Sequence, residues 1–456
     1  MKSLWFESAL LPHGWASRVR LTAANGCIDT VEVGVEATDR DERHAIAIPG
    51  LPNVHSHAFQ RGLAGLTERR GPADDSFWTW RELMYQFVER MDPDELEAIT
   101  ALAYAEMLEA GFTHVGEFHY LHQDRGGVAF ADPAELAGRV VAAAAHTGIG
   151  LTLLPVFYAH SGFGGLEPTA RQRRFVNDPE GFSRIVAASR KAVRSLGGAT
   201  VGVAPHSLRA VTPEELAAVV QLAQGGVIHI HIAEQTKEVE DCIAWCGRRP
   251  VEWLLERQAL DERWCLVHAT HVTETEVRRV AASGAVIGLC PITESSLGDG
   301  IFPAAAFLAR GGRFGVGSDS NILLDAAEEL RTLEYSQRLA HRARNVLAPT
   351  HDRSTGRSLY EAALRGGAQA LFPGVGAEAV GLTARASLDI VSLAPDHPAL
   401  IERREDEILD SWIFAGGRGV VDCVWRGGVK VVSNGRHARR DAILARYRRA
   451  LKTLLA

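Results

Sequence analysis

Two histidines separated by one residue, His55 and His57, are the first side chains along the chain that could hold a metal ion together. Residues i and i+2 of an extended segment point to the same side, so both imidazoles can face one cavity. The same spacing recurs at His229 and His231. We expect His231, at the end of its apolar run, to be the better ligand, whereas His229 lies deeper and is better explained as a hydrogen-bonded core histidine.

Other ionisable side chains also follow apolar runs. Asp319 comes after the run 314–317, where a buried carboxylate would be costly without a cation or a helix N-terminus as its partner. His268 comes after the run 264–267 and is a candidate for metal binding or for proton transfer. Three imidazoles and one carboxylate are typical of a hydrolytic Zn²⁺ or Fe²⁺ centre, in which the metal lowers the pKa of a bound water to about 7.

Other kinds of catalytic centre have weaker support. Glu117, near the end of the run 112–118, leaves a two-metal centre open as an alternative, although the runs 151–157 and 201–204 contain no bridging lysine, so one metal is preferred. The serines at 295–296 lack the strand–turn–helix context of a serine nucleophile. No glycine-rich phosphate loop follows a predicted strand. The sequence therefore favours a single divalent metal ion.

The residues that could do chemistry follow short apolar runs, which we interpret as strands buried on both faces. Longer segments with helical periodicity separate these runs, and one of them begins at Asp92 with a proline and a capping acid. Eight strand–helix alternations predict a (β/α)8 TIM barrel, with a doubly wound open sheet as the competing architecture. Such barrels build their active sites at the carboxyl ends of their strands. The eight runs are 45–49, 112–118, 150–157, 201–204, 227–232, 264–267, 285–289 and 314–317.

The two ends of the chain have a different pattern, with alternating apolar residues near the N-terminus and a hairpin around Gly427-Gly428 near the C-terminus. We therefore expect a small discontinuous β domain formed by both termini, with the barrel inserted between its halves. The predicted segments are 1–45 and 371–438 for the β domain, 46–370 for the barrel and 439–456 for a terminal helix.

The composition is that of a globular chain: of 456 residues, 46% are hydrophobic and 23% charged. A net charge of −7 argues against a nucleic-acid partner or an anionic membrane surface. No apolar stretch reaches the roughly 18–20 residues of a membrane span. Six scattered cysteines, Cys242 and Cys246 among them, are expected to be reduced thiols, so we predict a cytoplasmic protein.

Four segments, 49–62, 116–122, 206–209 and 290–300, resemble the amidohydrolase superfamily in its mononuclear deaminase branch. The resemblance covers nearly the whole chain and implies the barrel, a homodimer and one divalent metal, zinc in the first place and iron as the alternative. The metal ligands that it implies are His55, His57, His231 and Asp319.

The resemblance further implies that Glu234 and His268 handle protons together with Asp319. The same segments resemble enzymes of this branch that hydrolyse the formimidoyl C=N bond of N-formimidoyl-L-glutamate, a step of histidine degradation, to N-formyl-L-glutamate and ammonia. For this dicarboxylate substrate, Arg209 is expected to be the leading carboxylate clamp. Arg81 is either a second clamp or a surface arginine over neighbouring tryptophans. The neutral donors expected to position the substrate are Gln60, Tyr120 and His206.

Two alternatives remain open at this point. A deaminase of guanine or a related aminated heterocycle would keep the metal and the proton-handling groups but would need aromatic stacking in place of arginines. A non-catalytic metal-binding protein on the same fold would have no use for Glu234 and His268 as proton carriers.

Overall fold

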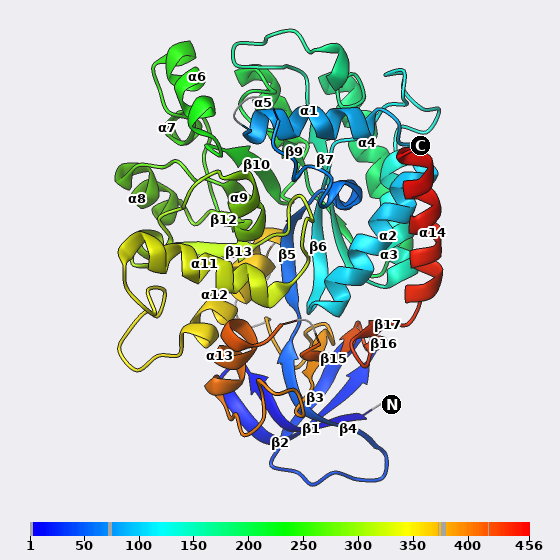
Figure 1. Cartoon of the computed structure of the whole chain (residues 1–456), viewed down its shortest axis with the longest axis vertical. Coiled ribbons are helices and arrows are strands. Elements are labelled where there is room, and N and C mark those ends of the chain that lie inside the picture. The colour runs from blue at the N-terminus through cyan, green and yellow to red at the C-terminus, as the bar shows by residue number, and fades with distance from the viewer. Residues whose placement is uncertain (1–2, 72–74, 373, 375–379, 418) are drawn as a thin grey trace.

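The computed structural model describes residues 3–71, 75–372, 374, 380–417 and 419–456 (Figure 1). The first two residues of the predicted segment 1–45, and residues 373, 375–379 and 418 of the segment 371–438, lie outside the described part. The strands form an eight-stranded mixed sheet, a five-stranded parallel sheet and a four-stranded parallel sheet. Figure 1 shows the mixed sheet below the two parallel sheets, whose flanks carry the helices.

The parallel sheets contain most of the predicted buried strands, and the runs 112–118, 150–157 and 264–267 are confirmed. Every residue of β5, β6, β7, β10, β11 and β12 is buried, as expected of strands covered on both faces. The strands are β5 (Leu51–Ser56), β6 (Phe112–His119), β7 (Gly150–Phe157), β8 (Thr200–Val201) and β9 (Ala204–Pro205) in one sheet, and β10 (Ile228–Ile232), β11 (Trp264–His268), β12 (Val286–Leu289) and β13 (Arg313–Val316) in the other.

The prediction that 45–49 is the first strand of the barrel is wrong. These residues belong to β4 (Asp41–Pro49), which pairs with β1 and β14 in the mixed sheet. The strand that pairs with β6 is β5, which contains His55 and begins directly after Gly50. Pro52 lies where the register with β6 shifts, a position at which a strand tolerates a missing N–H.

The mixed sheet combines strands from both ends of the chain in the order β17-β16-β15-β14-β4-β1-β2-β3. The predicted hairpin around Gly427-Gly428 is confirmed, because β15 and β16 pair antiparallel on either side of it. The bounds are β1 (Ser3–Leu11), β2 (Gly14–Ala24), β3 (Cys27–Val33), β14 (Ile390–Leu393), β15 (Val421–Arg426), β16 (Val429–Ser433) and β17 (Arg436–His437).

Helices connect the parallel strands and cover their outer faces (Figure 1). α2 begins with the predicted capping box between Asp92 and Glu95. None of the helices in the described residues is long and apolar enough to cross a bilayer. The bounds are α1 (Phe77–Val88), α2 (Pro93–Glu109), α3 (Glu135–Thr147), α4 (Pro179–Ala192), α5 (Pro213–Gln221), α6 (Thr236–Cys246), α7 (Pro250–Arg257), α8 (Glu274–Ser283), α9 (Pro291–Leu297), α10 (Ala304–Leu308), α11 (Ala326–His341), α12 (Thr355–Leu371), α13 (Asp406–Ala415) and α14 (Arg440–Leu454), with 3₁₀ turns η1 (Ala58–Leu63), η2 (Ala170–Gln172) and η3 (Val193–Ser195).

The two parallel sheets meet along both edges. Isolated parallel bridges join Val203 to Ile228 and Ser56 to Asp319. At the second junction the backbones approach closely: a Cβ on Gly317 would lie 2.8 Å from the Cβ of His55. Only glycine therefore fits there, and the carboxyl ends of β5 and β13 are brought together.

The buried carboxylate of Glu106 links η1, which follows β5, to the C-terminal helix α14. Glu106 of α2 pairs with Arg61 of η1 at 2.6 Å and with Arg440 of α14 at 3.1 Å. Burial alone would raise the pKa of Glu106, but the hydrogen bonds and charges of the two arginines lower it below the ordinary value of 4.5. The carboxylate form is therefore more favourable in the folded state than in the unfolded state.

Replacing Glu106 with Gln is expected to destabilise the fold by about 1.5–3 kcal/mol at pH 7, because two guanidiniums lose a charged acceptor. The lowered pKa means that the stabilisation is complete above the unfolded value near 4.5 and is lost as the pH falls through the folded value. Urea unfolding midpoints at pH 7 and pH 4 measure both effects. The control Glu135→Gln, in a half-exposed pair with Arg139, should cost only about 0.5 kcal/mol, and an equal loss in both variants would contradict the prediction.

Candidate active site

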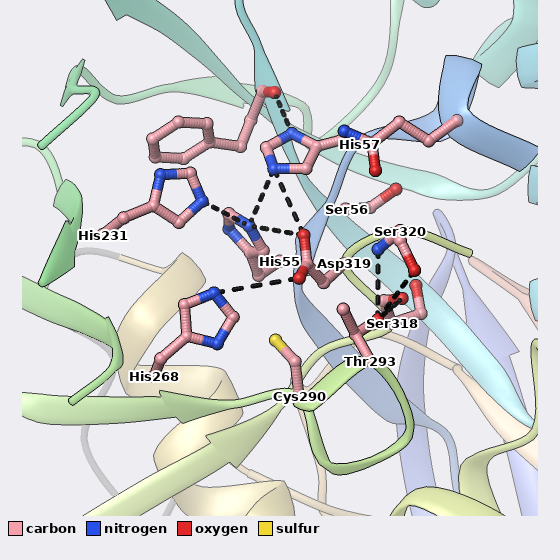
Figure 2. A network of polar contacts seen from close by, with 12 residues as sticks. His55, Ser56, His57, His231, His268, Cys290, Thr293, Ser318, Asp319 and Ser320 are labelled. Carbon is pink, nitrogen blue, oxygen red and sulfur yellow. Dashed lines mark hydrogen bonds and ion pairs between the residues drawn. The ribbon is translucent and has the colours of Figure 1, made fainter. Parts of the chain in front are cut away.

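Three imidazoles and one carboxylate meet at the carboxyl ends of the parallel strands. The ligand atoms of His55, His57, His231 and Asp319 all lie within 4.8 Å of one another, and all four residues are buried. Nε2 of His55 is 3.2 Å from Nε2 of His57 and 3.0 Å from Nε2 of His231. Asp319 Oδ1 lies 3.4 Å and 3.2 Å from Nε2 of His55 and His57 (Figure 2). The four side chains come from the ends of β5, β10 and β13, which are far apart in the sequence, and their ligand atoms lie close together.

Backbone carbonyls fix the orientation of two of these rings. Nδ1 of His57 donates to the carbonyl oxygen of Phe118 at 2.9 Å, and Nδ1 of His231 donates to that of His206 at 3.0 Å. A proton held on Nδ1 leaves the Nε2 lone pair free to bind a metal ion, which is the usual arrangement around metal-binding histidines.

The chemistry of this cluster fits a divalent cation. Burial lowers the pKa of His55 to about 3, and burial also lowers the pKa of His57 and His231, so the rings stay neutral. Neutral nitrogens with lone pairs facing one another repel unless a cation lies between them. Ligand atoms about 3 Å apart suit an ion that lies about 2.0–2.2 Å from each of them.

His268 and Glu234 lie beside the cluster. Nε2 of His268 is 3.7 Å from Oδ2 of Asp319 and 3.8 Å from Oε1 of Glu234. His268, Asp319 and Ala233 all have positive φ angles, of +68°, +43° and +50°. Such left-handed backbone is unfavourable for residues other than glycine and concentrates at functional sites. Here it turns side chains at the strand ends toward a common cavity.

This cavity is lined by every substrate-binding and proton-handling residue predicted from the sequence. Its wall also includes aromatic and apolar side chains that sequence reasoning did not single out. The lining residues are His57, Gln60, Phe77, Trp80, Arg81, Met84, Tyr85, Tyr120, Tyr158, Phe175, His206, Arg209, His231, Glu234, His268, Leu297 and Asp319.

Two guanidiniums face the cavity from different elements. Arg81 projects from α1 and Arg209 from the segment that follows β9, and the Nε atom of each is buried without a hydrogen-bond partner among the described residues. Their guanidinium carbons lie 4.7 Å and 5.7 Å from the ring centroid of Trp78. Arg81 thus stacks on a tryptophan, as the surface interpretation expected, and still lines the cavity.

The neutral side chains predicted to position the substrate, Gln60, Tyr120 and His206, also line the cavity. Nε2 of Gln60 donates to the hydroxyl of Tyr120 at 2.8 Å, which leaves Oε1 of Gln60 buried and without a partner among the described residues. His206 Nδ1 lies 3.1 Å from Oγ of Ser207, and burial lowers the pKa of His206 well below the ordinary value. These groups can donate or accept hydrogen bonds without adding charge to the cavity.

Two residues that the sequence left open have structural partners. Oε1 of Glu117 accepts the N–H of Ala58 at 2.7 Å, and Glu117 is not part of the metal-ligand cluster, which gives the two-metal alternative no support. His229 is buried and pairs with the carbonyl oxygen of Ala370 at 2.9 Å, as expected of a core histidine.

Two buried glutamates near the cavity were missed by sequence reasoning. Glu238 accepts the N–H groups of Ala233 and Glu234, at 3.0 Å and 3.2 Å, and lies 4.0 Å from the guanidinium of Arg209. Glu294 lies 3.2 Å from Nδ1 of His268. Both glutamates lie in the first turn of a helix, where an acid is ordinary, so the sequence gives no signal that separates them from capping residues.

The model of the amidohydrolase family matches residues 46–431, and the model described as the N-terminal domain of formimidoylglutamate deiminase HutF matches residues 1–45. A formimidoylglutamate deiminase of Pseudomonas aeruginosa is 49% identical over 457 residues, which cover 100% of both chains. A 5-methylthioadenosine/S-adenosylhomocysteine deaminase of Natronomonas pharaonis is 31% identical over 370 residues, 78% of this chain and 75% of that relative.

The chain is also similar to solved structures. A crystal structure of an amidohydrolase from Brucella melitensis is 54% identical, covers 100% of both chains and has a TM-score of 0.96. An adenosine deaminase from Xanthomonas campestris, crystallised with bound zinc, is 23% identical and has a TM-score of 0.81, covering 99% of this chain and 98% of that one. At that identity the second similarity concerns the fold alone.

Proposed function

The chain belongs to the amidohydrolase family, and on this basis we propose that it hydrolyses the formimidoyl C=N bond of N-formimidoyl-L-glutamate, releasing ammonia and N-formyl-L-glutamate. The observation that carries this choice of substrate is the pairing of Arg81 and Arg209 in the cavity that also holds the histidine–aspartate cluster. A substrate with two carboxylates can occupy both guanidiniums while its formimidoyl group reaches the cluster.

We propose that the eight parallel strands close into a (β/α)8 barrel. The bridges at both sheet edges, Val203 to Ile228 and Ser56 to Asp319, support closure. In this barrel β8 and β9 together are the fourth strand, interrupted where Val203 bridges to the neighbouring sheet. The cavity then lies at the carboxyl ends of the strands, the face on which barrel enzymes carry their active sites.

We propose that His55, His57, His231 and Asp319 hold one divalent metal ion and that this ion is zinc. Three imidazole nitrogens and one carboxylate oxygen form a ligand set that suits Zn²⁺, and Fe²⁺ accepts the same atoms. When bound, the ion would supply an activated water as nucleophile at neutral pH and would polarise the substrate.

The side chains around this centre have distinct proposed roles. Asp319 keeps its carboxylate form and accepts the proton that the attacking water loses. His268, whose Nε2 lies 3.7 Å from Oδ2 of Asp319, donates a hydrogen bond to the attacking water and stabilises the charge that develops there. Glu234 carries one proton to the imino nitrogen, and the proton taken up by Asp319 is then passed to the same nitrogen, which leaves as ammonia while the remaining hydroxyl proton restores Glu234. General acid–base steps of this kind contribute about 10²–10⁴-fold in rate.

The polar wall of the cavity would orient the substrate. Arg209 would bind one carboxylate and Arg81 the other, since a guanidinium matches a carboxylate with two parallel hydrogen bonds. Gln60, Tyr120 and His206 would hold the formimidoyl group and the nearer carboxylate without introducing charge.

Ammonia release from a small substrate panel is the experiment that tests this function. The metal-loaded protein is expected to release ammonia from N-formimidoyl-L-glutamate and not from guanine or adenosine. Prolonged dialysis against a chelator should remove this activity, and added Zn²⁺ should restore it. Ammonia release from a purine alone would favour the heterocycle deaminase instead. A protein that binds metal but hydrolyses nothing would support the non-catalytic alternative.

A further inference from the structure

We infer that Glu294 is a positioning residue of this reaction: its carboxylate holds the His268 imidazole so that the opposite ring nitrogen faces Glu234 and Asp319. The inference rests on the proposed function, in which His268 meets the reacting atoms. Glu294 itself does not line the cavity, so it would act only through His268.

The contacts fix the Glu294 carboxylate from two sides. Oε1 lies 3.2 Å from Nδ1 of His268 and accepts the N–H of Cys290 at 2.9 Å. The N–H of Glu294 donates in turn to the carbonyl oxygen of Cys290 at 2.9 Å. Glu294 is 7% exposed, so water does not compete strongly for this carboxylate. The Glu294 carboxylate is therefore a hydrogen-bond acceptor held in a fixed position at Nδ1 of the His268 ring.

A carboxylate on Nδ1 determines what the other nitrogen can do. The carboxylate keeps the proton on Nδ1 and prevents the ring from rotating about the Cβ–Cγ bond, so Nε2 points in one direction. That direction leads to Oδ2 of Asp319 at 3.7 Å and to Oε1 of Glu234 at 3.8 Å. His268 has 1% exposure and a φ of +68°, so its backbone also has little freedom to reposition the ring.

The alternative role for Glu294 is merely to cap α9. A second buried glutamate separates the two roles. Glu329 of α11 is fully buried and accepts the N–H of Ile292 at 3.0 Å, so it also holds the start of α9. Its hydrogen bond goes to that backbone and not to His268. Burial raises the pKa of Glu329 well above its ordinary value, so glutamine is a close replacement for its neutral form.

The test compares E294Q with E329Q in the full-length, metal-loaded protein. E294Q keeps the length of the side chain and an oxygen for the N–H of Cys290, but it loses the charge that anchors His268. We expect kcat for N-formimidoyl-L-glutamate to fall about 10–100-fold, with KM within about threefold and bound metal unchanged. E329Q should keep kcat within about twofold of the wild type. A second variant, E294D, retains the charge but not the reach, and should show the same fall in kcat.

A double-variant cycle asks whether Glu294 works through His268. The combination of E294Q with H268N should be no slower than H268N alone, because the anchored ring is already absent. Full kcat in both Glu294 variants, additive losses in the double variant, or an equal loss in E329Q would overturn the inference. If the wild type hydrolyses a purine from the panel instead, the proposed substrate is wrong. The same comparisons made on that purine still decide the role of Glu294.

Discussion

Replacing Asp319 with Asn is expected to lower kcat/KM for N-formimidoyl-L-glutamate by about 10³–10⁴-fold. Burial would raise the pKa of this carboxyl, but the hydrogen bond of His55 and the electrostatic effect of the surrounding imidazoles hold the pKa below its usual range. The carboxylate is therefore available at neutral pH both as a metal ligand and as a proton acceptor. An amide has no negative charge for the first role and no basicity for the second.

Ammonia release and bound metal per chain, measured on the same D319N sample, check this prediction. We expect less than one metal ion per chain after gel filtration, because one of four proposed ligands is weakened. The matched control D241N changes a half-exposed aspartate of α6 whose partner is Lys237, and it should behave like the wild type. Wild-type turnover in D319N would remove Asp319 from the centre, and the proposed mechanism with it.

Replacing Glu234 with Gln is expected to lower kcat by about 10²–10⁴-fold while leaving bound metal at the wild-type level. Glu234 is buried at the cavity wall, and its Oε1 lies 3.8 Å from Nε2 of His268. Gln has nearly the same shape, so substrate binding should survive, but it cannot deliver a proton to the leaving nitrogen. Steady-state kinetics should therefore show a large change in kcat and a small change in KM.

The pH dependence gives a second measure of the role of Glu234. Burial raises the pKa of Glu234 to about 7, against the lowering effect of His268. A carboxyl with this pKa is protonated below pH 7 and loses its proton above it, so a step that needs the proton slows as the pH rises. The alkaline limb of the wild-type kcat profile near pH 7 should be absent in E234Q.

The control for E234Q is E240Q, an exposed glutamate of the neighbouring helix α6. It should preserve both kcat and the pH profile. If E234Q retained most of the wild-type kcat, another group would have to protonate the leaving nitrogen. Together with D319N, these variants separate loss of the metal centre from loss of a proton carrier: D319N should lose metal, whereas E234Q should lose turnover only.

The sequence predicted the local elements well where the pattern was continuous. A strand buried on both faces must be apolar along its whole length, so runs such as 112–118 and 150–157 could be located without knowing their partners. The first strand shows the limit of that reasoning. The run 45–49 is as apolar as a buried parallel strand, but β4 pairs with β1 and β14, and β5 lies beside β6 despite Pro52. An apolar pattern indicates that a strand is buried, whereas the strand that it pairs with depends on contacts between segments far apart in the chain.

The sequence alone also identified which side chains can do chemistry, because imidazole and carboxylate groups after strand after strand are hard to explain as packing. Only the tertiary structure decided which of them meet: His55, His57, His231 and Asp319 share one point, while His229 turns to the carbonyl of Ala370. It also decided that Glu238 and Glu294, ordinary helix-capping acids by their position, lie against Arg209 and His268. The physical reason is that residue type is a local property, whereas burial, charge partners and hydrogen-bond geometry arise only when segments far apart in the chain are packed together.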